Sequence, residues 1–286
     1  MQANQTFKNL PKSFWATVKS VSQKTGYTVR NKGIVKVPTA QEILSAFIDL
    51  NLEPENIIRN NQETDLTKLL IAYYSYRADI LNNYVEPRLM DTDRAKKEFD
   101  KLYLKLAPSR SIPMNKQKGE KKAPAFFTGI INMIIESNLK GLGCDYDPRE
   151  LTTVTINGAP LRTLSRRVDG AFPSAINPQA IWEIKEYYYT TTFGSRVADG
   201  VYETLLDGME LEELEVSTQR KIQHILFIDD HYTWWQCGRS YLCRIIDMLH
   251  MGYVDEVIFG REIMTRLPEM AKEWKTIYEA TGKQEP

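Results

Sequence analysis

The sequence predicts an α/β protein, with a mixed sheet flanked by helices and a mostly helical region before it. Three observations lead to this prediction. Up to about residue 110 the apolar residues repeat at helical spacing, whereas after residue 123 patterns typical of helices and strands alternate. The composition is that of a globular protein, with 42% hydrophobic and 26% charged residues. A length of 286 residues leaves room for one large domain or two smaller ones.

Neither a membrane span nor an export signal is predicted. The longest apolar stretch, around residues 126–135, is interrupted by Thr128 and Asn132 and is shorter than the roughly 20 residues that a spanning helix needs. The first residues are polar, and three cysteines are too few for a disulfide framework in so long a chain. We therefore expect a soluble, cytoplasmic protein.

The net charge of zero conceals an asymmetry between the two parts of the chain. Residues 1–123 contain 21 Lys and Arg against 13 Asp and Glu, a net charge of +8, and residues 124–286 contain 16 against 24, a net charge of −8. A basic region is expected to bind a polyanion such as DNA, because lysine and arginine release the counterions of the phosphates. Zero net charge therefore does not exclude nucleic acid as a partner.

The most basic segment, residues 110–122, also contains the predicted domain boundary. Prolines and a glycine interrupt this region, and no apolar periodicity continues through it. The sequence thus predicts a basic, helical domain for DNA recognition at residues 1–110, a basic linker at 111–123 and a second domain at 124–286. The linker is either a solvated connection or an arm that contacts phosphates, through Lys116, Lys118, Lys121 and Lys122.

Three helices are predicted in the first domain. Thr39 is the expected cap of a helix over residues 40–50, Thr67 opens a second helix, and a third follows Asp91. A polar, basic stretch at residues 19–36 is expected to be a flexible loop or a small hairpin. Its side chains are of the kinds that reach phosphates and base edges, so contact with DNA is plausible.

The second domain is predicted to alternate helices and strands. A helix over residues 124–140 ends at Gly141, and the Asn157-Gly158 pair favours the tight turn of a β-hairpin. The further elements are hairpin strands at 151–156 and 161–172, strands at 180–189, 222–228 and 256–259, and helices at 197–206, 239–249 and 263–278.

Three charged residues are expected to meet on two neighbouring strands. Asp169 lies towards the end of the second hairpin strand, and Glu183 and Lys185 share one face of the next strand because strand side chains alternate. Two carboxylates at a sheet edge suit Mg²⁺, which takes few protein ligands and keeps several waters. A lysine beside them could orient or help deprotonate a water that attacks a phosphodiester.

The Glu-x-Lys pattern occurs three times, and only the copy at residues 183 and 185 falls on a strand. The copy at 120 and 122 lies in the linker, and the copy at 273 and 275 lies in a helix, where positions two apart do not share a face. The alternative interpretation of the strand copy is a charge pair that solvates an exposed sheet face.

These residues resemble the PD-(D/E)xK nuclease superfamily. Its core runs helix, three strands, helix, strand, and its active site is an acidic residue followed by (D/E)xK on the next strand. Asp169 matches the first acid, Glu183 the second and Lys185 the lysine, while Val168 stands where the motif has proline. Many members carry a helix glutamate before the core, for which Glu136 is the candidate; its alternative role is that of a surface helix residue. The resemblance covers about residues 124–259 and implies a restriction-endonuclease-like core in a catalytic domain.

Within the superfamily the chain looks most like a type II restriction endonuclease. The resemblance implies an Mg²⁺-dependent, sequence-specific endonuclease that cuts double-stranded DNA as a homodimer without ATP, with a cognate DNA methyltransferase as a genetic partner only. Ser195 and Arg196 resemble a segment that contacts DNA near the cut; the alternative is helix capping by Ser195 with Arg196 solvated. Two other functions stay open: a non-catalytic DNA-binding or phage-defence protein on a nuclease fold, and a nuclease for RNA or branched DNA.

Overall fold

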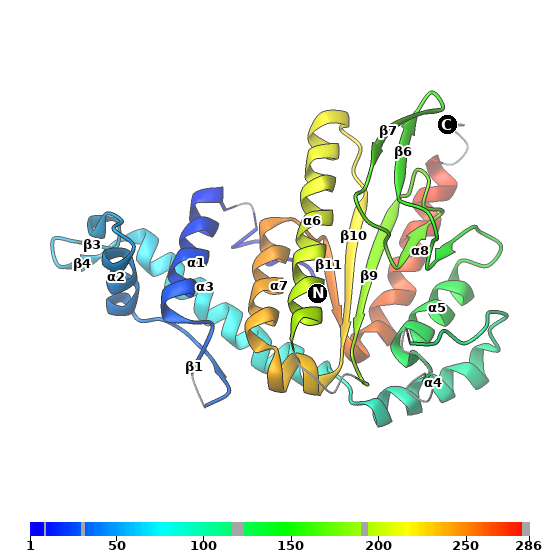
Figure 1. The fold of residues 1–286 in the computed structure, drawn as a ribbon, viewed down its shortest axis with the longest axis horizontal. Helices are drawn as coiled ribbons and strands as arrows, with labels where there is room; N and C mark the ends of the chain where they lie inside the picture. Colours follow the sequence, from blue (N-terminus) through cyan, green and yellow to red (C-terminus); the bar gives the residue numbers. More distant parts are fainter. Residues whose placement is uncertain (9, 30–31, 116–122, 190–193, 282–286) are drawn as a thin grey trace.

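A five-stranded mixed sheet forms the centre of the molecule in the computed structural model, which describes residues 1–8, 10–29, 32–115, 123–189 and 194–281 (Figure 1). The strand order is β11-β10-β9-β8-β5. Strands β9, β10 and β11 run parallel, whereas β8 is antiparallel to both β9 and β5. The strands are β5 (Asp145–Tyr146), β8 (Gly170–Phe172), β9 (Ala180–Glu186), β10 (Gln223–Asp229) and β11 (Glu256–Phe259).

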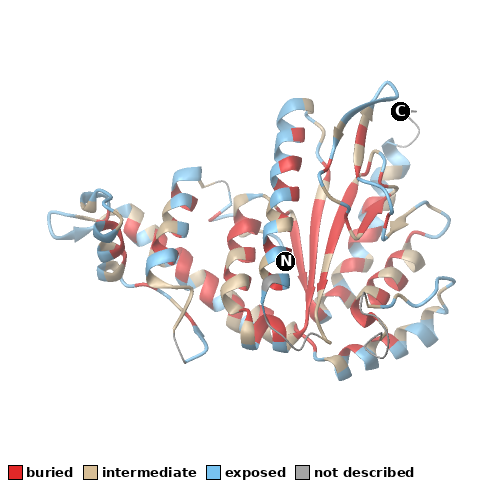
Figure 2. Cartoon of the chain, viewed as in Figure 1, coloured by how far each residue is buried: buried red, intermediate tan, exposed pale blue. Residues whose placement is uncertain are grey.

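Helices cover both faces of the sheet, so the α/β class with a mixed sheet flanked by helices is confirmed. One face packs against α6 (Ser195–Thr218) and α7 (Arg239–Met251), and the other packs against α5 (Phe126–Asn138) and α8 (Ile263–Thr281). The α5/α8 side contains a stack of aromatic rings in which Trp182 and Trp274 lie 5.6 Å apart and nearly parallel. Figure 2 shows that the central strands are almost entirely buried.

The N-terminal region is helical, as predicted, and extends away from the sheet (Figure 1). It contains α1 (Lys12–Thr25), α2 (Ala40–Asp49) and α3 (Asp65–Ile80), joined by two small hairpins, β1/β2 (Thr28–Val29, Ile34–Val35) and β3/β4 (Ile58–Arg59, Gln62–Glu63). Thr39 caps α2 through a reciprocal pair of hydrogen bonds with Glu42, which confirms the predicted cap. Helix α3 begins earlier than predicted, because Thr64 rather than Thr67 is its N-cap.

The basic stretch at residues 19–36 is neither wholly loop nor wholly hairpin. Its first residues complete α1, a helix that the sequence interpretation missed, and β1 and β2 form a hairpin beyond Gly26. Helix α1 was missed because Pro11 precedes it without a polar side-chain cap. Short turns of 3-10 or π type follow elsewhere, at Pro54–Asn56, Leu81–Val85, Glu86–Arg88, Tyr232–Cys237 and Gly260–Glu262.

Helix α4 (Thr92–Leu106) packs with the second half of the chain. It follows Asp91, as predicted, and the Asp91 side chain caps it. Its buried Ala95 and Phe99 belong to the same apolar cluster as α5 and α8. The apolar core of α1, α2 and α3 is a separate cluster. The packing therefore changes near residue 90, whereas the sequence interpretation placed this helix in an N-terminal domain that ends at residue 110.

Two buried polar contacts connect the first part of the chain to the second, one to helix α7 and one to the end of strand β10. The Arg77 side chain of α3 contacts both carboxylate oxygens of Asp247 of α7, at 2.9 and 3.0 Å. At the end of β10, buried Asp229 accepts hydrogen bonds from the Met90 backbone, at 2.7 Å, and from the Tyr188 hydroxyl. The link between the helical region and α4 is thus joined to the sheet beside the end of β9.

The predicted hairpin is only partly correct. Strands β6 (Thr153–Ile156) and β7 (Ala159–Thr163) form a separate two-stranded sheet, turned at Asn157 and Gly158, which both have positive φ. The second strand does not continue to residue 172. Leu164 and Val168 instead bury their side chains against Leu211 and Leu214 of α6, and the chain joins the main sheet only at β8.

Helix α6 is longer than the predicted range of 197–206, because it continues to Thr218. The remaining predicted strands and helices of the second half agree with the structure to within a few residues, and β11 agrees at both ends. All three cysteines are free thiols. Among the described residues, no helix is both long enough and apolar enough to cross a membrane.

Candidate active site

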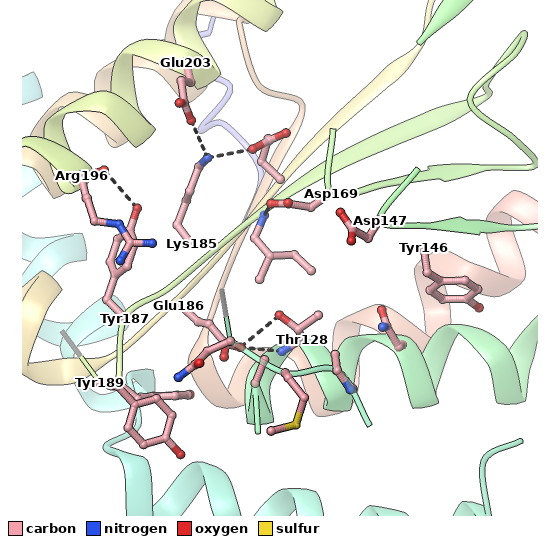
Figure 3. A pocket seen from close by; sticks show the side chains of 18 of the residues that line it. Thr128, Tyr146, Asp147, Asp169, Lys185, Glu186, Tyr187, Tyr189, Arg196 and Glu203 are labelled. Carbon is pink, nitrogen blue, oxygen red and sulfur yellow. Dashed lines mark hydrogen bonds and ion pairs between the residues drawn. The ribbon is translucent and has the colours of Figure 1, made fainter. Parts of the chain in front are cut away.

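A pocket of about 550 Å³ lies beside the carboxyl-terminal half of β9. Its walls come from β9, the first turns of α5 and α6, and the segments before β8 and before α5 (Figure 3). Asp169, Glu183 and Lys185 all line this pocket. The structure therefore brings together the three residues on which the sequence interpretation depended.

Asp169 lies immediately before β8, in the irregular segment rather than on the predicted hairpin strand. Its backbone N–H donates a hydrogen bond to the Trp182 carbonyl oxygen at 3.1 Å. Its side-chain Oδ2 accepts a hydrogen bond from the backbone N–H of Ile184 at 2.8 Å. The side chain is thus fixed to β9 beside Glu183. The next residue must be glycine, because a Cβ at Gly170 would lie 2.1 Å from the Trp182 ring.

Glu183 and Lys185 share the face of β9 that α6 covers, as the strand alternation predicts. Their side-chain atoms Oε2 and Nζ lie 2.7 Å apart, and the Lys185 Nζ also contacts Glu203 of α6 at 3.1 Å. Glu183 is 0% exposed and Lys185 is 7% exposed. The alternative interpretation, a charge pair on a solvent-exposed sheet face, is therefore wrong.

Helix α6 can cover these charges because it approaches β9 closely at Gly200. A Cβ at this position would lie 2.9 Å from the Tyr187 hydroxyl and 3.3 Å from Cδ of Lys185. The absence of a side chain leaves room for the extended lysine, whose ammonium reaches Glu203 one turn further along the helix. Figure 3 shows Lys185 pointing from β9 towards Glu203.

A second cation completes the charge cluster. Arg166, three residues before Asp169, contacts Glu183 at 2.9 Å and Asp207 of α6 at 2.7 Å. Burial would raise the pKa of the Glu183 carboxyl, but Lys185 and Arg166 outweigh burial and hold this pKa below its ordinary value. Burial, reinforced by Glu183, raises the pKa of Asp207 to about 7.

Glu186 faces the opposite wall of the pocket. Its Oε2 accepts hydrogen bonds from the backbone N–H and the hydroxyl of Thr128, at 2.6 and 3.2 Å. Helix α5 has no acidic residue in its first turn and no side-chain cap of its own, so Glu186 supplies an anion to its N-terminus. Burial nevertheless raises the pKa of Glu186 to about 7.

Glu136 is not part of this pocket. Thr128 and Asn132 of α5 line it, but Glu136 lies one turn further along, lines a smaller hollow and accepts a hydrogen bond from the Ser109 hydroxyl. Because a helix rises about 1.5 Å per residue, Glu136 is about 12 Å along the axis from Thr128. Glu136 therefore does not line the pocket that contains Asp169.

The predicted DNA-contacting residues have mixed placements. Arg196 is exposed at the start of α6 and lines the pocket, and its carbonyl accepts a hydrogen bond from Tyr187 at 3.2 Å. Ser195 is the first residue of α6, but its side chain lies outside the described residues. The linker lysines at 116, 118, 121 and 122 also lie outside them. Arg110, just before the linker, lines the pocket, and its guanidinium carbon lies 3.9 Å from the centre of the Tyr146 ring.

The pocket can be tested for its fit to a divalent cation. Within the ranges that the structure describes, no group of three or more His, Cys, Asp or Glu side chains is placed to hold a metal. Mg²⁺ commonly uses only one or two carboxylates and completes its shell with waters and substrate phosphates. Asp169 and Glu183 fit this arrangement, and with Glu203 three carboxylates line the pocket beside two cations, Lys185 and Arg166.

The sequence interpretation missed the residues that complete the pocket. Arg166 was visible as a basic residue just before Asp169, but its partners lie about 40 positions away on α6, where no local pattern signals them. Asp147 was missed because β5 has only two residues; its backbone N–H donates to the Asp169 carbonyl at 2.9 Å, and Figure 3 shows it next to Asp169.

The fold and the pocket define a mixed α/β protein with a buried, charged site at the side of its central sheet. By its sequence, the chain belongs to the family described as "Domain of unknown function (DUF7687)", whose model matches residues 90–274. The model of a second family, "Domain of unknown function (DUF7690)", matches residues 1–84. No curated protein and no solved structure matches the chain. The two family models meet close to residue 90, where the packing also changes.

Proposed function

We propose that this protein is an Mg²⁺-dependent endonuclease of the PD-(D/E)xK type that cuts double-stranded DNA at a specific sequence, like a type II restriction enzyme. One observation carries the proposal: Asp169 and the Glu183/Lys185 pair lie on adjacent segments and line one pocket. The element order adds support, because α5, the antiparallel strands β5, β8 and β9, α6 and the parallel strand β10 follow the order of that superfamily's core.

Each residue has a distinct role in this proposal. Asp169 and Glu183 would hold Mg²⁺, which when bound would neutralise charge on the scissile phosphate. Lys185 is positively charged, because Glu183 and Asp169 outweigh the effect of burial and raise its pKa above the ordinary value. Its ammonium group would therefore donate hydrogen bonds to the phosphate or to the attacking water. Arg110 and Arg196 at the pocket lining would bind neighbouring phosphates.

A second candidate is a non-catalytic DNA-binding or defence protein that retains a nuclease-like core. The ion pairs around Glu183 favour it, because a carboxylate already paired with two cations can be purely structural. Nucleases that act on RNA or on branched DNA would use the same pocket and differ only in substrate.

The deciding experiment is digestion of plasmid, linear, branched and RNA substrates with and without Mg²⁺. Asp169→Asn should abolish cleavage and leave the melting temperature nearly unchanged, because the amide keeps one oxygen acceptor for the Ile184 N–H. Glu183→Gln should also abolish cleavage, and Ca²⁺ should support DNA binding without cutting. If the protein cleaved only RNA or only branched DNA, that nucleic acid and not double-stranded DNA would be its substrate.

Lys185→Ala tests the lysine directly. We expect single-turnover cleavage to slow by about 10²- to 10³-fold, the range for loss of one hydrogen-bond donor that stabilises charge in the transition state. Lys275→Ala is the control, because it removes the lysine of the Glu-x-Lys pattern in α8, far along the chain from the pocket lining. Binding of DNA without cleavage of any substrate by the wild-type protein would favour the second candidate.

A further inference from the structure

Arg166 lies at the edge of the pocket and contacts three carboxylates. It lies in the irregular segment between β7 and β8, and its guanidinium reaches across to α6. Nη1 lies 2.9 Å from Oε1 of Glu183 and 2.7 Å from Oδ2 of Asp207. Nη2 donates to Oε2 of Glu203 at 3.1 Å and to Oε2 of Glu183 at 3.3 Å. One planar group therefore bridges three carboxylates from two elements.

The geometry restricts the Glu183 carboxylate on both oxygens. Arg166 contacts Oε1 and Oε2, and Lys185 contacts Oε2 from the same strand. A guanidinium presents its donors in a rigid plane, so Nη1, which donates to Asp207, and Nη2, which donates to Oε2 of Glu183, fix the Glu183 carboxylate relative to α6. Glu183 and Asp207 have no exposed side-chain surface, so no bulk water replaces these contacts.

We propose that Arg166 is a positioning residue for the nuclease reaction: it fixes the orientation of the Glu183 carboxylate at the pocket lining, and it does so through its planar guanidinium and not only through its charge. The inference rests on the proposed function. Arg166 acts through Glu183, and buried Asp207, which does not line the pocket, anchors the other side of the guanidinium.

The chain contains a matched structural arginine for comparison. Arg162 comes from the same region of the chain and also pairs with α6, at 3.5 Å from Glu210 and 2.8 Å from Glu213. Its exposed fraction, 30%, is close to the 24% of Arg166. Arg162 does not line the pocket. If the only role of these arginines is to bind this segment to α6, replacement of either one should lower the melting temperature by a similar amount and leave metal binding unchanged.

The test uses the full chain with Arg166→Lys and Arg162→Lys. Three quantities are measured: the melting temperature, the Kd for Mn²⁺ alone by calorimetry, and single-turnover cleavage in Mg²⁺. Arg166→Lys keeps the positive charge but replaces the planar guanidinium, with its two Nη donors, by a single ammonium group. We expect it to weaken Mn²⁺ binding by about 10- to 100-fold, as loss of a ligand-orienting partner typically does, and to slow cleavage by a similar factor. Arg162→Lys should leave the Mn²⁺ Kd and the rate unchanged.

Two results would overturn the inference. Wild-type Mn²⁺ affinity and rate in Arg166→Lys would mean that charge alone matters at this position. Equal losses of melting temperature in both variants with an unchanged Mn²⁺ Kd would mean that Arg166 is only a structural tie. Asp207→Asn is the second variant in case Arg166→Lys does not fold, and it should weaken Mn²⁺ binding by loosening the anchor of Arg166. A wild-type protein that neither binds Mn²⁺ nor cleaves any substrate would instead refute the proposed function, and this inference with it.

Discussion

Replacement of Arg77 by methionine should destabilise the protein strongly, because it leaves a buried carboxylate without its cation. Arg77 and Asp247 are 1% and 3% exposed, and Tyr73 donates a further hydrogen bond to Asp247 at 2.5 Å. Removal of one partner of a buried ion pair typically costs about 3 to 5 kcal/mol, because the other charge stays buried. The expected loss in the free energy of unfolding is therefore in this range.

A double-mutant cycle separates the cost of leaving the Asp247 carboxylate unpaired from the cost of losing the packing of the Arg77 side chain. Arg77→Met with Asp247→Asn removes both charges, so we expect the double variant to be more stable than Arg77→Met alone. Arg94→Met is the control, because Arg94 pairs with Glu98 on an exposed helix face and should cost at most about 1 kcal/mol. Urea denaturation followed by circular dichroism measures the wild type, Arg77→Met, Asp247→Asn, the double variant and the Arg94→Met control. A loss below about 1 kcal/mol for Arg77→Met, or a double variant less stable than the single one, would refute the reasoning.

Three further predictions concern pH, packing and salt. Burial raises the pKa of Asp229 to about 8, so the folded state binds its proton more tightly than the unfolded state, and this stabilisation is lost as the pH rises through 8. The difference in melting temperature between the wild type and Asp229→Asn should therefore decrease from pH 5 to pH 9. A difference that does not change with pH would contradict this. Gly170→Ala should cost about 1 to 3 kcal/mol through its overlap with Trp182, whereas Gly194→Ala, whose Cβ would meet nothing within 4 Å, should change stability by at most about 0.5 kcal/mol in thermal melts. Neutralising the four linker lysines should weaken DNA binding and reduce the slope of log K against log salt concentration by up to about 3 to 4, as measured by filter binding. The lysines are Lys116, Lys118, Lys121 and Lys122. An unchanged slope would mean that the linker only connects the two parts of the chain.

Local patterns in the sequence were sufficient for features that depend on neighbouring residues. The shared face of Glu183 and Lys185 follows from strand alternation, and the turn at residues 157 and 158 follows from its two residue types. The Thr39 cap likewise depends only on residues three positions apart. Each of these features involves interactions within a few residues, which is why composition and spacing could reveal them.

Features that depend on long-range packing were not predictable in the same way. Asp169 lies in an irregular segment because Leu164 and Val168 turn towards α6 instead of continuing a strand. Helix α6 continues past residue 206 because Leu211 and Leu214 on its second half bury against that same segment. Neither contact has a local signature, so the sequence suggested a longer strand and a shorter helix.

The junction near residue 90 sets the spacing between the two parts of the chain. Arg77 and Asp247 join α3 to α7, while Met90 and Tyr188 share Asp229 beside the end of the strand that carries the pocket. Both contacts are buried, so a movement of the helical region relative to the sheet would have to break them. Under the proposed nuclease function, DNA bound along α1, α2 and α3 would therefore reach the pocket at a constant distance along the duplex. The offset between the recognised sequence and the cleaved bond would then be a fixed property of the molecule.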